Sequence, residues 1–145
     1  MRLPDGTTFP SIPVNKPLVG LYFAASWCPD CADVTPAVAN VAKAMDEIWN
    51  VVYIASDSTK AQMESYIPTS FTPLPFENEQ ERSKIKKYFG VCAAKEIATL
   101  GMSPVDRKSG IPTLIVLETS TGKVISTKGV EEIMELKEQA LKRWI

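Results

Sequence analysis

The sequence contains no histidine, and this absence removes several kinds of enzyme at once. Without an imidazole there is no histidine general base, no Ser/His or Cys/His nucleophile pair and no histidine-ligated metal. Cysteine is also scarce, with 3 residues in 145, but two of the three stand close together, at positions 28 and 31. If the protein is an enzyme, cysteine is therefore its leading reagent.

Long apolar runs and an excess of charge of one sign are missing as well. No stretch approaches the roughly 20 apolar residues that a membrane span needs, and 16 basic residues nearly balance 17 acidic ones. The charge balance therefore points neither to nucleic acid nor to an anionic membrane as a partner. An apolar content of 45% and a charged content of 23% are typical of an ordinary soluble protein.

The start of the chain carries no targeting pattern. Met1 is followed by Arg2, Leu3 and Pro4 and then by polar turn residues, which gives neither an apolar signal peptide nor an Arg/Ser-rich transit segment. The odd number of cysteines also argues against a secreted disulfide framework. These features predict a cytoplasmic protein, with the nucleus as a second compartment.

The pattern of apolar residues predicts one α/β domain over residues 1–145, because no repeat, low-complexity tract or long linker divides the chain. Short apolar runs predict strands at residues 18–25, 51–55 and 114–117, with a returning strand at 123–127. Apolar residues at helical spacing and capping residues predict helices at residues 31–48, 59–66, 78–89 and 130–144. Residues 91–110 show no clear period and are predicted to form an irregular insertion. This order of elements predicts a central mixed β-sheet flanked by α-helices on both faces.

The run Trp27-Cys28-Pro29-Asp30-Cys31 lies where the first strand is expected to end and the first helix to begin. A Cys-x-x-Cys at this junction suits thiol-disulfide exchange, because the spacing lets the two sulfurs close a small ring. Cys28 is expected at the helix N-terminus, where backbone N–H groups and the positive end of the helix dipole favour its thiolate. Cys31 is expected one turn in and more buried. We therefore predict that Cys28 attacks a substrate disulfide and that Cys31 resolves the mixed disulfide.

The residues around the cysteines indicate a reducing protein. Pro29 stiffens the turn and removes a backbone donor that could have stabilised the Cys28 thiolate. Asp30 and Asp33 place negative charge beside Cys28, which opposes the effect of the helix dipole. The reduction potential is therefore expected nearer the value of about −270 mV of thioredoxin than the value of about −120 mV of the oxidant DsbA.

The same residues also have simpler interpretations. A Cys-x-x-Cys can be half of a zinc site, but four soft ligands are wanted, and without histidine only Cys92 is left over, so no metal is expected. A structural disulfide is disfavoured in an intracellular chain. Cys92 is expected to be an inert buried or surface thiol, with redox regulation as the alternative. Trp27 is either ordinary packing or, as its place directly before Cys28 favours, a wall of the site.

The sequence resembles the thioredoxin superfamily, and within it the tryparedoxin and nucleoredoxin branch. The segment Tyr22-Phe-Ala-Ala-Ser-Trp-Cys-Pro-Asp-Cys31 is similar to the Tyr-Phe-Ser-Ala-Ser-Trp-Cys-Pro-Pro-Cys core of that branch. Further similarities are Thr35-Pro36, Val51 to Asp57, Pro73 to Phe76, Tyr88 to Val91, and Ile111-Pro112-Thr113-Leu114. The resemblance covers about Leu18 to Gly129 and implies a thioredoxin fold.

The resemblance also implies roles for individual residues. Cys28 would be the nucleophile, Cys31 the resolving thiol and Pro112 a cis-proline that faces them, with the backbone of Ile111 free to pair with an extended substrate. An ordinary trans-proline at a strand start is the alternative for Pro112. Trp27, Pro29 and Asp30 would complete the substrate-binding surface. Tyr22 stands where many thioredoxins carry a buried acid, so resolution by Cys31 needs another proton acceptor or water.

Two departures from the branch bear on the substrate. Asp30 replaces its second proline, and Trp-Cys-Pro-Asp-Cys is similar to a small thioredoxin-related protein that prefers low-molecular-weight disulfides to protein disulfides. The excursion from Cys92 to Gly110 is longer than the link expected before the cis-proline and is expected near the edge of the site, where it could select partners.

The leading hypothesis is a protein-disulfide reductase. It would act on disulfide-containing proteins such as peroxiredoxins and draw electrons from a reductase or a low-molecular-weight dithiol, with no bound cofactor. The alternative is a redox-sensing binding protein that docks partners according to the oxidation state of Cys28 and Cys31. A peroxidase is disfavoured, because no Arg or Thr lies between the two cysteines to polarise a peroxide.

Overall fold

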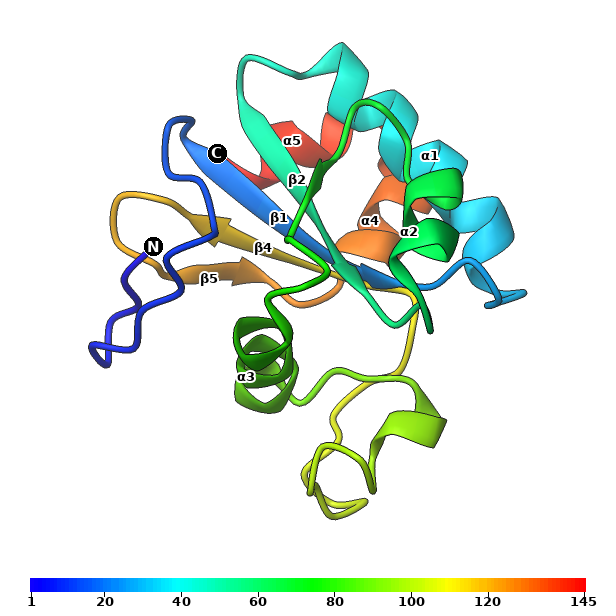
Figure 1. Cartoon of the computed structure of the whole chain (residues 1–145). Coiled ribbons are helices and arrows are strands. Elements are labelled where there is room, and N and C mark those ends of the chain that lie inside the picture. The colour runs from blue at the N-terminus through cyan, green and yellow to red at the C-terminus, as the bar shows by residue number, and fades with distance from the viewer.

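A five-stranded β-sheet forms the centre of the computed structural model, which describes all 145 residues (Figure 1). The strands lie in the order β3-β2-β1-β4-β5. Their bounds are β1 (Leu18–Ala24), β2 (Trp49–Ala55), β3 (Thr72–Pro73), β4 (Thr113–Glu118) and β5 (Val124–Ser126). Strand β1 pairs in parallel with β2 and antiparallel with β4, so the sheet is mixed, as the sequence predicts.

Helices cover both faces of this sheet. They are α1 (Cys31–Ala44), α2 (Lys60–Tyr66), α3 (Glu79–Phe89), α4 (Gly129–Leu136) and α5 (Gln139–Trp144), with one 3-10 turn, η1 (Ala94–Glu96). In Figure 1, α1, α2, α4 and α5 lie on one face, and α3 lies on the other. The predicted fold class is confirmed. None of the helices combines the length and the apolar character that crossing a bilayer requires.

Strand β1 contributes to two hydrophobic cores, because successive side chains of a strand point to opposite faces. Leu18 and Tyr22 belong to the larger core, with residues of α1, α4 and α5. Val19, Leu21 and Phe23 belong to a second core with α3 and the N-terminal segment. Burying each large side chain stabilises the fold by about 1.5–3 kcal/mol. The end of β1 is thus fixed from both sides before the chain enters the Cys-x-x-Cys loop.

The prediction of a single closing helix over residues 130–144 is wrong, because this segment forms two helices, α4 and α5. Lys137 lies between the two helices with φ +51° and ψ −130°, a backbone conformation that no helix contains. Leu141 and Trp144 of α5 are nevertheless buried, and the Trp144 ring lies 5.5 Å from that of Trp49. Because the apolar spacing continues across the break, periodicity alone could not reveal it.

Two other boundaries differ from prediction. Helix α1 ends at Ala44, four residues before the predicted end, and residues 45–48 form turns. Met45 and Ile48 still pack against the larger core, which explains why they continued the helical pattern. Strand β3 lies where the sequence predicts no strand. It consists of Thr72 and Pro73 at the edge of the sheet, the position where a strand tolerates proline.

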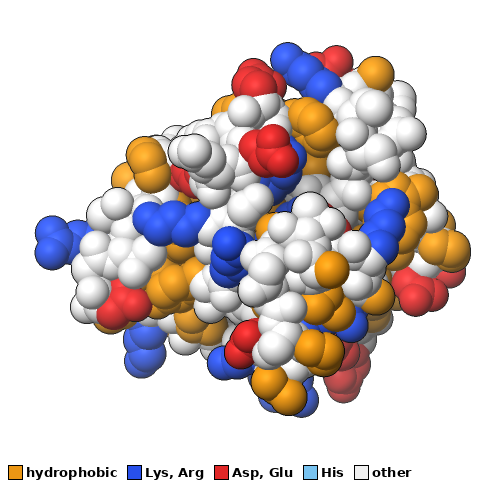
Figure 2. All heavy atoms as spheres, turned by 60° about the horizontal axis from the view of Figure 1, so that its bottom comes forward, with side chains coloured by type: hydrophobic (Ala, Val, Ile, Leu, Met, Phe, Trp, Pro, Cys, Tyr) orange, Lys and Arg blue, Asp and Glu red, His pale blue; other side chains and the backbone are white.

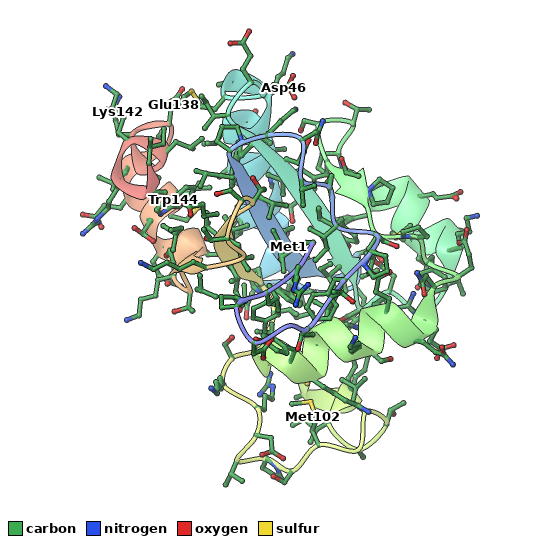
Figure 3. The ribbon with its side chains drawn as sticks, turned by 90° about the vertical axis from the view of Figure 1, so that its left-hand side faces the viewer. Met1, Asp46, Met102, Glu138, Lys142 and Trp144 are labelled. Atoms are coloured by element: carbon green, nitrogen blue, oxygen red, sulfur yellow. The ribbon has the colours of Figure 1, made fainter.

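Residues 91–110 form an excursion that leaves and re-enters the fold at neighbouring points. Val91 forms an isolated bridge with Ser109, and the N–H of Lys108 donates to the carbonyl of Gly90 at 2.7 Å. Between these ends lie η1 and a series of turns. The excursion extends away from the sheet beyond α3, and Met102, which lies within it, is labelled in Figure 3.

The surface carries charges of both signs close together. On the face in Figure 2, which brings the underside of Figure 1 forward, Lys and Arg side chains lie among Asp and Glu without a broad patch of one sign. The whole sequence carries a net charge of −1. A partner that recognises this face would therefore do so through individual charged groups.

Candidate functional site

The two cysteines meet in the loop between β1 and α1. Their sulfurs lie 2.6 Å apart as free thiols, with the Cys31 thiol donating to the Cys28 sulfur. The N–H of Cys31 also donates to the Cys28 carbonyl at 3.2 Å, which closes the turn. Cys28 retains 6% of its exposure and Cys31 none, so Cys28 is the thiol nearer the surface. This asymmetry was predicted from the sequence.

Helix α1 starts at residue 31, as the apolar spacing predicts, but the positions expected for the two cysteines along it are wrong. Cys31 is the first residue of α1, and Asp30 stands at the N-cap position without a side-chain hydrogen bond to the helix. Cys28 therefore lies in the turn before the helix, and Cys31 is not one turn in. The N–H of Cys28 donates to the carbonyl of Ala25 at 3.2 Å, so a tight turn at the end of β1 sets its position.

The start of β4 approaches the same thiols from a distant part of the sequence. The peptide bond between Ile111 and Pro112 is cis, as the resemblance implied. The Cys28 sulfur lies 4.0 Å from the carbonyl oxygen of Ile111. The sheet brings these groups together because β4 pairs with β1, with Thr113 opposite Phe23.

The other residues expected at the site surround this centre. Trp27 is 40% exposed, and its indole Nε1 donates to the carbonyl of Ser56 at 2.9 Å. That bond ties the ring to the end of β2, so Trp27 is a fixed and partly exposed wall of the site. Pro29 and Asp30 are exposed in the turn between the cysteines.

A chain of hydroxyl groups, which the sequence did not reveal, lies behind Cys31. The hydroxyls of Tyr22 and Thr35 lie 2.7 Å apart, and those of Thr35 and Tyr66 lie 2.8 Å apart. The Tyr66 hydroxyl donates to the carbonyl of Cys31 at 3.2 Å. A carbonyl can only accept and each hydroxyl has one proton, so Tyr22 must donate to Thr35 and Thr35 to Tyr66. The chain anchors the first residue of α1 to β1 and α2.

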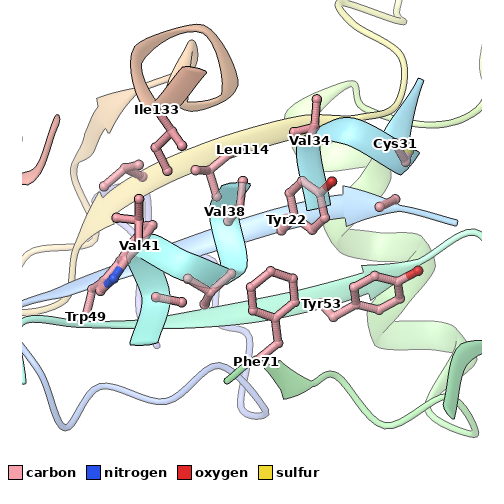
Figure 4. Close-up of a cluster of buried hydrophobic side chains, with 14 of the residues drawn as sticks. Tyr22, Cys31, Val34, Val38, Val41, Trp49, Tyr53, Phe71, Leu114 and Ile133 are labelled. Atoms are coloured by element: carbon pink, nitrogen blue, oxygen red, sulfur yellow. The ribbon is translucent and has the colours of Figure 1, made fainter. Parts of the chain in front are cut away.

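The larger core encloses one end of this arrangement. In Figure 4 it runs from Trp49 at one end to Cys31 at the other, with Tyr22 and Val34 between the sheet and α1 near Cys31. Thr35 carried a usable signal, since it is a polar residue one turn after Cys31 on the same helix face. Tyr66 carried none, because its contact depends on how α2 folds back.

Burial controls the ionisation of the groups behind the nucleophile. Removal from water, together with the hydrogen bond to the Cys28 sulfur, raises the pKa of the Cys31 thiol to about 12. Burial likewise raises the pKa of the Tyr22 hydroxyl well above its usual range. Both groups therefore keep their protons at neutral pH.

Two acidic residues, the buried Asp57 and the partly buried Glu96, fix the loops around the site. Asp57 accepts from the backbone N–H of Ser26 at 2.7 Å and from the hydroxyl of Tyr53 at 2.9 Å. Glu96 of η1 accepts from the hydroxyl of Ser56 and from the ammonium of Lys86, each at 2.6 Å. Glu96 thereby attaches the 91–110 excursion to the strand end that holds Trp27. The sequence contains no signal for these roles, because the partners are far apart in the chain.

The structure gathers no set of three or more thiol or carboxyl groups in positions that could hold a metal ion.

Cys92 is fully buried, and its carbonyl accepts from the Arg107 guanidinium at 2.9 Å. Burial raises the pKa of the Cys92 thiol.

Several known proteins are similar to this chain in sequence. A family profile described as thioredoxin-like matches residues 15–124. The tryparedoxin of Trypanosoma brucei brucei is 31% identical over 120 residues, which cover 81% of this chain and 72% of the tryparedoxin. Mouse nucleoredoxin is 25% identical over 134 residues, which cover 90% of this chain and 27% of the nucleoredoxin. The chain thus spans about a quarter of the length of the nucleoredoxin that it matches.

Solved structures are similar in fold over most of the chain. A tryparedoxin from Trypanosoma brucei superposes with a TM-score of 0.69 at 30% identity, covering 90% of this chain and 80% of that one. A tryparedoxin II complexed with glutathionylspermidine superposes with a TM-score of 0.68 at 26% identity, covering 91% of this chain and 81% of that one.

Proposed function

Because this chain belongs to the thioredoxin-like family, in its tryparedoxin and nucleoredoxin branch, we propose that it is a thiol-disulfide oxidoreductase that reduces disulfides in target proteins. The observation that carries the proposal is the meeting of three features at one point. The Cys28 and Cys31 sulfurs lie together, the Ile111 carbonyl and cis-Pro112 lie beside Cys28, and an exposed Trp27 flanks them.

Cys28 carries out the first step. Its thiolate attacks one sulfur of the substrate, a bond forms between Cys28 and that sulfur, and the substrate disulfide breaks. The extended backbone of the substrate pairs with the backbone of Ile111, next to cis-Pro112. Trp27, Pro29 and Asp30 supply the surrounding contact surface. The second substrate sulfur leaves as a thiolate.

Cys31 carries out the second step. The Cys31 thiol still carries its proton at this point, because its pKa is raised. The departing substrate thiolate takes that proton. The Cys31 thiolate then attacks the Cys28 sulfur 2.6 Å away. The mixed disulfide breaks, the other half of the substrate leaves as a thiolate that takes a proton from water, and a Cys28–Cys31 disulfide remains. Two electrons have then passed from the protein to the substrate.

The oxidised protein needs a reductant that returns two electrons and one proton, which restores the Cys28 thiolate and the Cys31 thiol. We propose a reductase or a low-molecular-weight dithiol in this role, supported by the similarity to a tryparedoxin crystallised with glutathionylspermidine. Proteins that cycle through a disulfide, such as peroxiredoxins, are the proposed substrates. No bound cofactor is required, because both electrons come from the two sulfurs.

The test is the reduction of insulin disulfides with dithiothreitol as donor. The wild type, Cys28→Ser and Cys31→Ser are compared at equal concentration. We expect turnover by the wild type only, and a mixed disulfide with substrate that accumulates in Cys31→Ser and never forms in Cys28→Ser.

Two other outcomes would change the assignment. Inactivity on insulin with activity on cystine or glutathione disulfide would replace protein substrates by small ones. Inactivity of the folded wild type on every disulfide would contradict the reductase proposal. It would favour a redox-sensing protein that binds its partner according to the state of the two thiols.

A further inference from the structure

A positively charged group stands beside the dithiol without a partner in the protein. Lys95 lies on η1, and its ammonium nitrogen is 3.9 Å from the centroid of the Trp27 ring. The Lys95 side chain is exposed, and no carboxylate lies within 4.0 Å of its ammonium. A cation over an indole face is attracted by the π electrons while its N–H groups remain open to a further ligand.

The position of Lys95 over the ring is fixed by the next residue. The Glu96 carboxylate accepts from the N–H of Ala93, the hydroxyl of Ser56 and the ammonium of Lys86. The carbonyl of the same Ser56 accepts from the Trp27 indole. Ser56 therefore holds both the ring and the turn that carries Lys95, so the two side chains keep their relative position.

Two acidic groups near Lys95 are already engaged. Glu96 is neutralised by Lys86 at 2.6 Å, and Asp57 accepts hydrogen bonds from Ser26 and Tyr53. A hollow of about 250 Å³ opens beside Lys95, and its lining includes both the basic Arg82 and Lys86 and the acidic Asp57, Glu79 and Glu96. The candidate anion site is therefore the Lys95 ammonium over the exposed Trp27 ring, where an anionic group of a substrate bound at Trp27 can reach it.

We propose that Lys95 and the Trp27 ring form a subsite that binds a carboxylate of the disulfide substrate. The subsite rests on the proposed reductase function and narrows its substrate class to acidic peptides, with a Glu or Asp near the reacting cysteine. The ammonium pairs with the carboxylate, and the aliphatic part of the acidic side chain lies against the indole. Because the pair is exposed, we expect a preference of about two- to fivefold, which weakens as salt is added.

The preference can be measured on the first chemical step alone. The probes are two short disulfide-linked peptides that differ only in carrying Glu or Gln beside the cysteine. In a Cys31→Ser background, the rate constant for mixed-disulfide formation at Cys28 is followed by acid quenching and mass spectrometry. The Glu-to-Gln ratio of rate constants cancels differences in the reactivity of Cys28 between variants.

The variants are Lys95→Gln, Lys95→Glu and a matched control, Lys84→Gln. Lys84 also places its ammonium near an aromatic ring, 5.3 Å from the centroid of Phe9, which belongs to the core on the other face of the sheet. We expect a ratio of about two to five for the background protein and for Lys84→Gln. We expect a ratio near one for Lys95→Gln and below one for Lys95→Glu.

Each other outcome contradicts a different statement. Equal rates for the two peptides with the background protein would overturn the subsite and leave the reductase function standing. A preference that survives in Lys95→Gln would overturn the role of Lys95. No mixed disulfide with either peptide, from protein that urea denaturation shows to be folded, would overturn the reductase function and the subsite with it.

Discussion

Cys28 and Cys31 are close neighbours in the chain, but their sulfurs have different surroundings. Cys31 has no exposed surface, and burial with the hydrogen bond to the Cys28 sulfur raises its pKa to about 12. Cys92 is equally buried, and burial raises its pKa as well. A thiolate is the reactive form, so these two thiols should resist alkylation.

We expect iodoacetamide at pH 7 to modify Cys28 at least about a hundred times faster than Cys31 or Cys92. Labelling of Cys31 should rise about tenfold for each pH unit, because the thiolate fraction of a group titrating near pH 12 grows in that proportion below its pKa. Peptide mass spectrometry after timed quenching measures all three rates. Equal labelling of Cys28 and Cys31 at pH 7 would contradict the assigned roles.

Asp30 is the residue between the cysteines that departs from the family pattern, and its charge is exposed. Asp30→Asn removes that charge, which stabilises the Cys28 thiolate and hence the reduced protein. We expect the reduction potential to rise by about 5–20 mV from a value of about −270 mV. Equilibration with a dithiothreitol redox buffer measures the change.

Asp46→Asn is the matched control for this change. Asp46 is exposed and lies just beyond the far end of α1, where it pairs with Lys16 at 3.2 Å. The control should leave the potential unchanged. A fall in the potential of Asp30→Asn would show that the Asp30 charge does not disfavour the thiolate.

At the scale of elements, the buried ion pair of Lys86 and Glu96 joins α3 to η1. Burial alone would raise the pKa of Glu96, but the charge and hydrogen bonds of Lys86 lower it below its ordinary value of 4.5. Glu96 therefore contributes stability at pH values above 4.5. That stability is lost as the pH falls through the lowered pKa of the folded protein.

Glu96→Gln should destabilise the protein by about 2–4 kcal/mol at pH 7, because it leaves the Lys86 charge buried without a partner. Urea denaturation measures the loss, and trypsin should cleave at Arg107 and Lys108 faster as the excursion loosens. The double variant Lys86→Met/Glu96→Gln removes the buried charge and should recover part of the stability. Unchanged cleavage in Glu96→Gln would show that the ion pair does not hold the excursion.

For the whole molecule, the core that contains Phe9 and the core that contains the two cysteines lie on opposite faces of the sheet. A substitution in the first core can therefore lower stability without changing the chemistry at the cysteines. Phe9 is fully buried in the core away from the cysteines, with ring centroids 5.7 Å from Tyr88 and 6.3 Å from Phe89. Phe9→Ala should lower the free energy of unfolding by about 3–5 kcal/mol. The exposed Val14→Ala should change it by less than about 0.5 kcal/mol.

The rate of insulin reduction per folded molecule should be the same in Phe9→Ala as in the wild type. Denaturation in urea and the insulin assay on one preparation measure both quantities. A large fall in that rate would indicate that the N-terminal core also determines the geometry of the dithiol loop.

The sequence was sufficient for the features that depend on local pattern. The apolar runs of β1, β2 and β4 and the spacing along α1 predicted the mixed sheet, and the resemblance identified the cis bond before Pro112. The break at Lys137 was missed because the apolar spacing of α4 continues into α5. The start of α1 at residue 31 was predicted correctly, but placing Cys28 at the helix N-terminus and Cys31 one turn in was wrong, because Asp30 takes the N-cap position.

The contacts between distant segments could not be predicted. Lys95 and Trp27 meet only because Glu96 attaches η1 to Ser56. Tyr66 reaches Cys31 only because α2 folds back against α1. These contacts join residues that are distant in the chain, and the sequence contains no pairing signal for them. The domain limits of residues 1–145 remain a prediction.

The excursion of residues 91–110 begins and ends at hydrogen-bonded neighbours, Gly90 and Lys108. A loop whose two ends already touch can be exchanged for a shorter or longer one without stretching the strands that it joins. This loop carries Lys95 but neither Cys28 nor Cys31. The residue proposed to set substrate preference and the two residues that carry out the redox chemistry therefore lie in different segments, and the loop can be replaced without changing the two thiols. Grafting the loop onto a relative that keeps the counterparts of Trp27 and Ser56 would transfer the preference.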